Sequence, residues 1–210
     1  MSPDIQREAI KLFSCLEYGE QLAYDCALEQ SKIIESKKSQ RFLKVQALQE
    51  FMHAKFYNKA IDHIDSRNKR YLPKSLIIYA DRLRQAMVNK DVTDYLVGSQ
   101  VVLEGFGEQL LLNLNIGLDK HDVGFKRIRK LIIRQEQSHH AFGIRALKSQ
   151  LEEGKVKSER IGTLMSEYLY HVQCIINEME EVFYYFDERP EDYYEPLIAE
   201  LPDWLKGTVK

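Results

Sequence analysis

The chain has 210 residues, and its 44% hydrophobic content is enough to fill a sizeable core in one domain. Its 30 basic and 32 acidic residues give a net charge of −2, which argues against nucleic acid as the main partner because a phosphate binder needs a basic excess. The three cysteines form no CxxC pair, which disfavours a disulfide framework, a zinc ribbon and a rubredoxin-type iron site.

The distribution of apolar residues also bears on localisation. No apolar run approaches the length that a membrane-spanning helix needs, and charges are mixed into the first turns of the N-terminal segment. We therefore expect a cytoplasmic protein with no membrane span.

Helices are predicted along most of the chain. The five prolines leave 4–72 and 74–189 free of proline, and apolar residues recur at spacings of three and four. Strand signals are weak, because Asn-Gly and Asp-Gly turns and sustained apolar/polar alternation are missing from the sequence. The expected long helices lie at about 4–35, 39–68, 92–116, 121–153 and 157–186, with a short helix at about 75–88.

Short breaks separate these helices, and the turn signal at 117–120 is one of them. Long helices joined by short turns must lie antiparallel, so the expected fold class is all-α, a four-helix bundle with an added C-terminal helix and an irregular tail. We expect a single domain over 1–210, with core helices at about 4–153 and a fifth helix and tail at about 157–210.

Two Glu-x-x-His patterns, Glu50 to His53 and Glu136 to His139, are the main chemical signal. At a spacing of three on a helix both side chains point the same way, so each pair can bind one metal ion. A two-metal site in a helical bundle also needs a lone Glu from each of the other two helices.

The first lone Glu is selected by its distance from the turn at 36–38. In an antiparallel hairpin it must lie about as far from the turn as its partner, Glu50, does on the other side. Glu20 comes within about one helical turn of that distance, whereas Glu17 lies further from the turn and Glu29 lies closer to it, and both miss the distance by more than Glu20 does. Glu20 fits best.

The second lone Glu is selected in the same way at the turn near 117–120. The distance of Glu104 from this turn comes close to that of Glu136 on the other side, whereas Glu108 lies one helical turn nearer, so Glu104 fits best. A likeness between the two halves leaves alternatives open. Aligning their Leu-Glu pairs matches Glu17 with Glu104, whereas aligning their Glu-Gln-Leu triplets matches the first-half Glu20 with Glu108.

Charge explains why such a set points to metal. Four carboxylates carry four negative charges, which balance two divalent irons, and oxygen and imidazole ligands suit ferric and ferrous iron. Two metals a few ångströms apart can bind O2 between them. Burying four carboxylates without a metal would be costly, so inward-facing carboxylates would make a metal nearly obligatory.

Three stretches carry a family resemblance: Gly19–Asp25, Val101–Glu104 and Arg134–Gly143. They resemble ligand motifs of the ferritin-like di-iron carboxylate superfamily, with the nearest likeness to the cyanobacterial aldehyde-deformylating oxygenases. The resemblance implies a ferritin-like bundle and maps the first ligand onto Glu20. Gln135 departs from it, because the family has Asp there, which weakens the usual carboxylate partner of a ligating His. The fifth helix and the tail do not match the family.

The main expectation is a non-haem di-iron oxygenase or oxidase that activates O2 to oxidise a small organic substrate, with a fatty aldehyde or an amine as candidates. The expected cofactors are two iron ions, with manganese as a candidate substitute. Without a flavin or Rossmann fingerprint, electrons would come from an external donor, a ferredoxin or a reductase, and a homodimer is a candidate assembly. The expected ligands and catalytic residues are Glu20, Glu50, His53, Glu104, Glu136 and His139.

Two alternatives remain open: an iron-oxidising or peroxide-reducing ferritin-like protein, similar to ferroxidases or rubrerythrins, and a helical bundle without metal. An oxygenase predicts an apolar cavity beside the metals, an iron-handling protein an acidic access path, and a metal-free bundle solvent-facing Glu and His side chains. Candidate lining residues, which ordinary core packing would explain equally well, are Phe51, Met52, Leu103 and Phe106.

Three further residues have expected places outside the ligand set. His140 follows His139 by one residue and points about 100° away from it, so a surface position is expected. His171 is expected to be a partly buried histidine, and Tyr24 a core residue one helical turn after Glu20.

Overall fold

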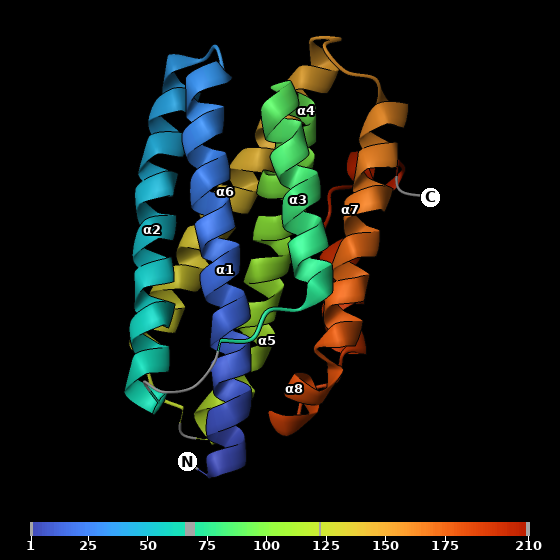
Figure 1. The fold of residues 1–210 in the computed structure, drawn as a ribbon. Helices are drawn as coiled ribbons and strands as arrows, with labels where there is room; N and C mark the ends of the chain where they lie inside the picture. Colours follow the sequence, from blue (N-terminus) through green and yellow to red (C-terminus); the bar gives the residue numbers. More distant parts are fainter. Residues whose placement is uncertain (1, 66–69, 122, 209–210) are drawn as a thin grey trace.

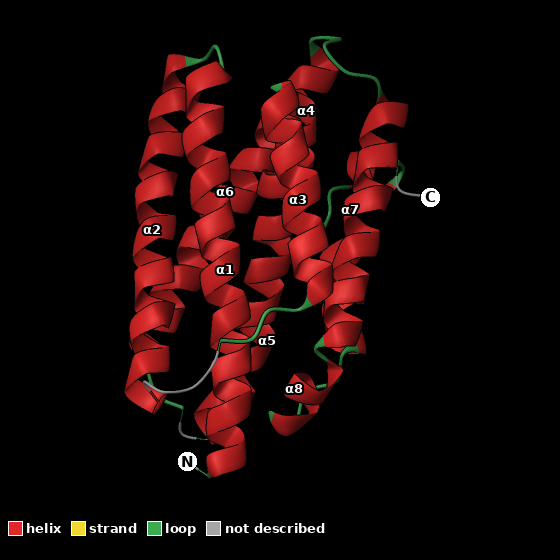
Figure 2. Ribbon diagram, viewed as in Figure 1, coloured by secondary structure: helices red, strands yellow, loops and turns green. Residues whose placement is uncertain are grey.

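All regular structure in the described part of the chain is helical (Figures 1 and 2). The computed structural model describes residues 2–65, 70–121 and 123–208. Its elements in chain order are α1 (Pro3–Ile33), α2 (Lys37–Asp65), α3 (Lys74–Asn89), α4 (Val92–Tyr95), the π-helix η1 (Leu96–Leu103), α5 (Glu104–Lys120), α6 (Lys126–Glu152), α7 (Ser158–Glu178), α8 (Glu180–Tyr185), α9 (Glu191–Ala199) and α10 (Asp203–Lys206). The all-α prediction is confirmed.

Two hairpins form the centre of the bundle. Helices α1 and α2 run side by side along their length, and α6 packs antiparallel against the continuous path of η1 and α5 (Figure 1). Helices α3 and α7 pack against each other, and α7 also contacts η1. Ser2 begins α1 by accepting a hydrogen bond from the Ile5 amide, which satisfies one of the free donors of the first turn.

Several helix limits differ from the sequence-based expectation. The turn expected near 117–120 is wrong, because α5 continues to Lys120 and α6 begins at Lys126. Gly117 lies inside α5, where an added Cβ would collide with the Phe186 carbonyl oxygen. This glycine therefore permits a close approach of the C-terminal segment rather than a turn.

The C-terminal part also differs in detail. The helix expected at 157–186 is divided at Met179 into α7 and α8, and the tail carries the short helices α9 and α10. Helix α9 packs against α5. The expected end of the second helix at 66–68 lies outside the described residues.

The π-helix η1 is the main irregularity of the bundle. It follows α4 directly and ends where α5 begins, so the helix expected at 92–116 has three segments. The hydroxyl of Tyr79 donates to the Gly98 carbonyl at 2.6 Å, and the hydroxyl of Tyr168 donates to Asp94 at 2.6 Å. These buried bonds from α3 and α7 satisfy polar groups in the π-helix and in α4 just before it.

A large apolar cluster from all the long helices fills the interior. Its largest fully buried members include Phe13, Tyr57, Tyr79, Tyr168 and Phe183. Among the described residues, no helix combines the length and the apolar character needed to cross a membrane.

Candidate metal centre

The six side chains selected from the sequence come together inside the bundle, in two overlapping groups. Within each group, one potential ligand atom per residue lies within 4.8 Å of the others. The first group is Glu20, Glu50, His53 and Glu136, and the second is Glu50, Glu104, Glu136 and His139. Each of the six is at most 7% exposed, so the solvent-facing arrangement expected of a metal-free bundle is not found among them.

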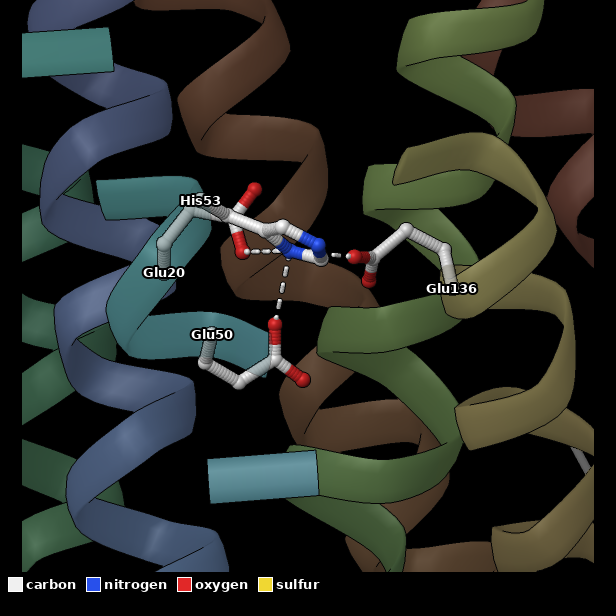
Figure 3. A group of neighbouring side chains, drawn as sticks. All are labelled: Glu20, Glu50, His53 and Glu136. Atoms are coloured by element: carbon white, nitrogen blue, oxygen red, sulfur yellow. Dashed lines mark hydrogen bonds and ion pairs between the residues drawn. The ribbon is translucent and has the colours of Figure 1, made fainter. Parts of the chain in front are cut away.

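The first group converges on one imidazole nitrogen, as Figure 3 shows. Nδ1 of His53 lies 3.1 Å from a carboxylate oxygen of Glu20, 3.1 Å from one of Glu50 and 3.2 Å from one of Glu136. The second group repeats this pattern. Nδ1 of His139 lies 2.8 Å from a carboxylate oxygen of Glu50, 3.4 Å from one of Glu104 and 3.9 Å from one of Glu136.

Glu50 and Glu136 belong to both groups, with one oxygen near each histidine. Each sits three residues before a histidine on the same helix, α2 or α6, so one helical face presents both side chains. Each group therefore has one Glu and one His of its own, and it shares Glu50 and Glu136 with the other group. This is the arrangement of ligands that two adjacent cations require.

A close approach between α6 and η1 determines which Glu enters the second group. A Cβ on Gly143 would come within 2.6 Å of Gln100, so these two residues face each other across the antiparallel pair. His139 precedes Gly143 by one helical turn on α6, and Glu104 follows Gln100 by the same four-residue step. Glu104 therefore faces His139, and Glu108 lies one helical turn too far along α5.

The other ring nitrogen of each histidine contacts a glutamine from the opposite helix. Nε2 of His53 lies 2.7 Å from the amide oxygen of Gln135 on α6, and Nε2 of His139 lies 2.9 Å from the amide oxygen of Gln49 on α2. An amide oxygen only accepts hydrogen bonds, so Nε2 carries the proton in each ring. Gln135 thus still supplies a histidine partner, but an uncharged one.

The role of Gln49 was missed from the sequence, and Gln135 was noted only as a replacement that weakens the usual carboxylate partner, although both precede a Glu-x-x-His pattern. That repeated Gln-Glu step was the available signal. A third glutamine is also involved, because the Gln46 amide donates to Glu104 at 2.7 Å. Among the described residues, Glu20 makes its only hydrogen bond to His53, so the two lone carboxylates are held differently.

Burial and mutual repulsion perturb the carboxylates. Burial raises the pKa of Glu20 well above its usual value, and the charge of Glu136 adds to this shift. The pKa of Glu104 is also raised well above its usual value, by burial and then by the charge of Glu50. Burial acts on Glu50 in the same direction, but the charge of His139 outweighs it and lowers the Glu50 pKa to about 2.

The imidazoles respond to the same crowding. Burial alone would lower the pKa of His53, but the charge of Glu20 and the polar contacts with Glu136, Glu20 and Glu50 together outweigh it and raise that pKa. Burial likewise opposes the charge of Glu50 at His139, and the pKa of His139 is raised. Without a metal, protons therefore offset part of the negative charge of the cluster.

Three buried atoms of the cluster test whether a metal fits. Among the described residues, no hydrogen bond reaches Glu50 Oε1, Glu136 Oε1 or His139 Nδ1. Glu50 Oε1 lies 2.8 Å from His139 Nδ1, and Glu136 Oε1 lies 3.2 Å from His53 Nδ1, so each atom faces another potential ligand atom without a hydrogen bond. Such buried polar atoms are costly, and a cation between them would satisfy them. Four carboxylates and two imidazoles suit iron or manganese in charge and ligand type. The residues present therefore fit a pair of divalent cations.

A narrow apolar cavity borders Glu20, Glu104 and Glu136 between α1, α5 and α7. The volume of this cavity is about 60 Å³. Its apolar lining is Leu16, Ala23, Leu76, Leu103, Phe106, Leu110, Val172, Ile175 and Met179. Leu103 and Phe106 lie where a pocket was expected.

The other two expected lining residues do not border this cavity. Phe51 and Met52 are 38% and 58% exposed, because they lie on the outer face of α2. Tyr24 is partly buried and packs against the Phe51 ring, with 6.0 Å between ring centroids. His171 is partly buried near Tyr79, as expected.

The two alternative carboxylates, Glu17 and Glu108, lie outside both groups. Glu17 forms an ion pair with Arg70 at 2.9 Å. Glu108 lies 3.3 Å from Nδ1 of His140. The expected surface position of His140 is wrong, because its side chain is only 13% exposed and packs between α6 and α5.

Comparison with known proteins shows which solved structures share this fold. No family model matches the chain, and no curated protein matches it. A solved structure described as "Protein 19 with aldehyde deformylating oxidase activity from Synechococcus" aligns with a TM-score of 0.82 and 13% identity, covering 99% of this chain and 92% of that one. The chain thus has the ferritin-like all-helical fold that the motif resemblance implied.

Proposed function

We propose that this chain is a single-domain di-iron oxidase or oxygenase that uses O2 to oxidise a small organic substrate with a slender apolar body. The observation that carries this proposal is the pair of overlapping Glu and His groups, which share Glu50 and Glu136 and of which Glu20, Glu104 and Glu136 border an apolar cavity. The solved structure of similar fold supports it, because its description names an aldehyde-deformylating oxidase.

The six buried side chains would hold the irons as two linked sites. Glu20 and His53 would bind one ion, Glu104 and His139 the other, and Glu50 would bridge them together with Glu136. Bound iron supplies electrons and Lewis acidity for O2 activation. Two ferrous ions supply two electrons, so an external donor, a ferredoxin or a reductase, would restore the ferrous state.

The cavity would position the substrate and keep water away. Apart from its carboxylates and the Cys15 thiol, its lining is mainly aliphatic and aromatic, so an alkyl chain would lie against Leu103 and Phe106 and place its polar end near Glu20 and Glu104. Exclusion of water protects a reactive site from side reactions. The small volume of the cavity, about 60 Å³, favours an unbranched fatty aldehyde or amine over a bulky ring.

An iron-oxidising protein is the second candidate, and one observation favours it. Glu108, His140 and Glu200 line an open pocket beside α6, next to the turn that carries Glu136 and His139. Its two carboxylates are the groups that an access path for iron as a substrate would need, and Arg145 also lines it. The apolar cavity that borders Glu20, Glu104 and Glu136 favours the oxygenase.

Anaerobic loading with Fe(II) followed by exposure to O2 distinguishes these functions. For the oxygenase we expect two irons per chain, and O2 uptake that alkyl aldehydes or amines accelerate with formation of an oxidised product seen by mass spectrometry. Filling the cavity with Val172→Phe should abolish product formation while iron loading persists, whereas Val45→Phe on the exposed face of α2 should change neither. Repeated Fe(II) turnover to ferric mineral, indifferent to organic compounds, would establish the iron-oxidising function instead.

A further inference from the structure

Two uncharged amides stand behind the imidazoles of the proposed metal centre. We propose that Gln49 and Gln135 are positioning residues that orient both rings and, by carrying no charge, bias the bound irons toward the ferrous state. This inference rests on the proposed di-iron function and deepens it. It concerns the redox balance of the centre, which the six ligands alone do not set.

The two contacts cross between the helices in opposite directions. Gln49, on α2 beside Glu50, reaches His139 on α6 at 2.9 Å, and Gln135, on α6 beside Glu136, reaches His53 on α2 at 2.7 Å. In each case the residue before a shared carboxylate holds the histidine of the other helix. The position of each shared carboxylate is therefore linked to the orientation of the imidazole ring on the other helix.

Orientation follows from the chemistry of the amide. Its oxygen accepts the Nε2 proton, so the same ring leaves Nδ1 free to bind a cation. Nδ1 of His53 and of His139 is the atom that faces the carboxylates in each group. Such outer partners fix the tautomer and the plane of a metal-ligating histidine.

The redox consequence follows from charge. Four ionised carboxylates balance two divalent irons, and oxidation of each iron to the ferric state releases one electron and leaves one extra positive charge in the cluster. A carboxylate behind each ring would offset that charge and make the imidazole a stronger donor. An amide adds no charge and is a weaker acceptor than a carboxylate, and the buried surroundings screen the extra charge poorly. The ferrous state is therefore favoured relative to a carboxylate-partnered centre.

The positions of the two glutamines make this testable, because both are only partly buried and can accept a charge. Gln49→Glu, Gln135→Glu and the double variant would be loaded with Fe(II) and titrated by spectroelectrochemistry, with the electrode accepting the electrons. We expect each single variant to lower the midpoint potential and the double variant to lower it most. Gln137→Glu adds the same charge at an exposed site on α6 and should shift the potential much less.

A second measurement tests orientation without iron chemistry. Gln135→Leu and Gln49→Leu should weaken Co(II) binding roughly 10–100-fold by calorimetry. In the NMR spectrum of the Co(II) protein, each should remove one of two shifted, exchangeable imidazole N–H signals. Circular dichroism checks the fold, and the Glu variants still test the charge effect if a Leu variant does not fold.

The outcomes separate the two levels of the proposal. Suppose that the wild-type protein binds two metal ions. Equal shifts of the midpoint potential in Gln135→Glu and Gln137→Glu would then overturn the charge effect. Leu variants with unchanged Co(II) affinity and N–H signals overturn the positioning role. A wild-type protein that binds no metal overturns this inference and the proposed function together.

Discussion

The two halves of the candidate centre carry the same ligand types on different backbones. In the first half, Glu20 lies on the regular helix α1, and its only hydrogen bond among the described residues is to His53. In the second half, Glu104 begins α5 directly after the π-helix and accepts a hydrogen bond from Gln46. The same chemistry can therefore be built on a regular helix or on an irregular one that packing restrains.

This difference predicts unequal freedom. Glu104 is held by Gln46 from α2 and lies beside a segment that Tyr79 fixes from α3. Within the described chain, the Glu20 carboxylate accepts no comparable hydrogen bond from an amide side chain. We therefore expect Glu20 to be the carboxylate that changes position more readily. The predictions below test how far the two halves are independent.

The largest effect should come from the shared carboxylates. Glu50→Ala and Glu136→Ala should each remove both metal ions, because each carboxylate belongs to both groups. Glu20→Ala should mainly release the ion of the first half. Elemental analysis after anaerobic Fe(II) loading measures this, with the ion-paired surface residue Glu17 changed to Ala as the control. If Glu20→Ala lost as much metal as Glu50→Ala and Glu136→Ala, the two-site arrangement would be contradicted.

The second half offers a matched pair of carboxylates one helical turn apart. Glu104→Ala should release metal, whereas Glu108→Ala should leave it bound, because Glu108 faces His140 outside both groups. The axial offset between them is about 6 Å, too far for both to reach one ion equally. Metal analysis of the two variants side by side decides the matter, and the reverse result would mean that Glu108 is the ligand.

Stability of the metal-free protein should fall as the pH rises from about 6 to about 9. The folded-state pKa values of Glu20, Glu104, His53 and His139 are all raised, so the folded protein holds more protons than the unfolded chain. Unfolding then becomes easier as the pH rises, by at most about 1.4 kcal/mol per pH unit for each such proton.

Urea unfolding with a chelator present, repeated across this pH range, measures the effect. Glu50 has the opposite sign, since its pKa is lowered to about 2, and its contribution is lost only in acid. Metal-loaded protein should show a flatter profile, because the cations replace the protons. Stability of the metal-free protein that rises with pH would contradict the proton count.

The smallest effect should come from Gln46→Leu, which removes the amide hydrogen bond to Glu104 and leaves Glu20 untouched. Hydrogen bonds to charged groups contribute about 1.5–3 kcal/mol, so binding of one of two Co(II) ions should weaken about tenfold or more. A stepwise Co(II) titration resolves this, with Gln21→Leu on the exposed face of α1 as the control. Equal weakening of both ions would show that the halves are coupled.

Local patterns in the sequence determined much of this architecture. Apolar spacing and the placement of proline predicted the long helices, because a helix buries one face and proline interrupts its hydrogen bonds. The Glu-x-x-His spacing predicted that Glu50 and His53 share a face, as do Glu136 and His139, because neighbours three apart on a helix lie together. These features depend on residues close in sequence.

Tertiary packing decided the rest. Glu104 was selected by its distance from a turn at 117–120, but α5 ends at Lys120 and α6 begins at Lys126. Counted from these ends, Glu136 lies nearer to the connection than either candidate, and Glu108 matches its distance better than Glu104 does. Distance from the true turn would therefore have favoured Glu108.

The actual register comes from the contact of Gly143 with Gln100, where the missing side chain lets α6 approach η1 closely. The π-helix, the crossed pairing of Gln49 with His139 and the helical turns of the tail are long-range outcomes of the same kind. Each depends on which surfaces meet once the helices pack, and spacing within one helix carries no record of how far its neighbour slides along it.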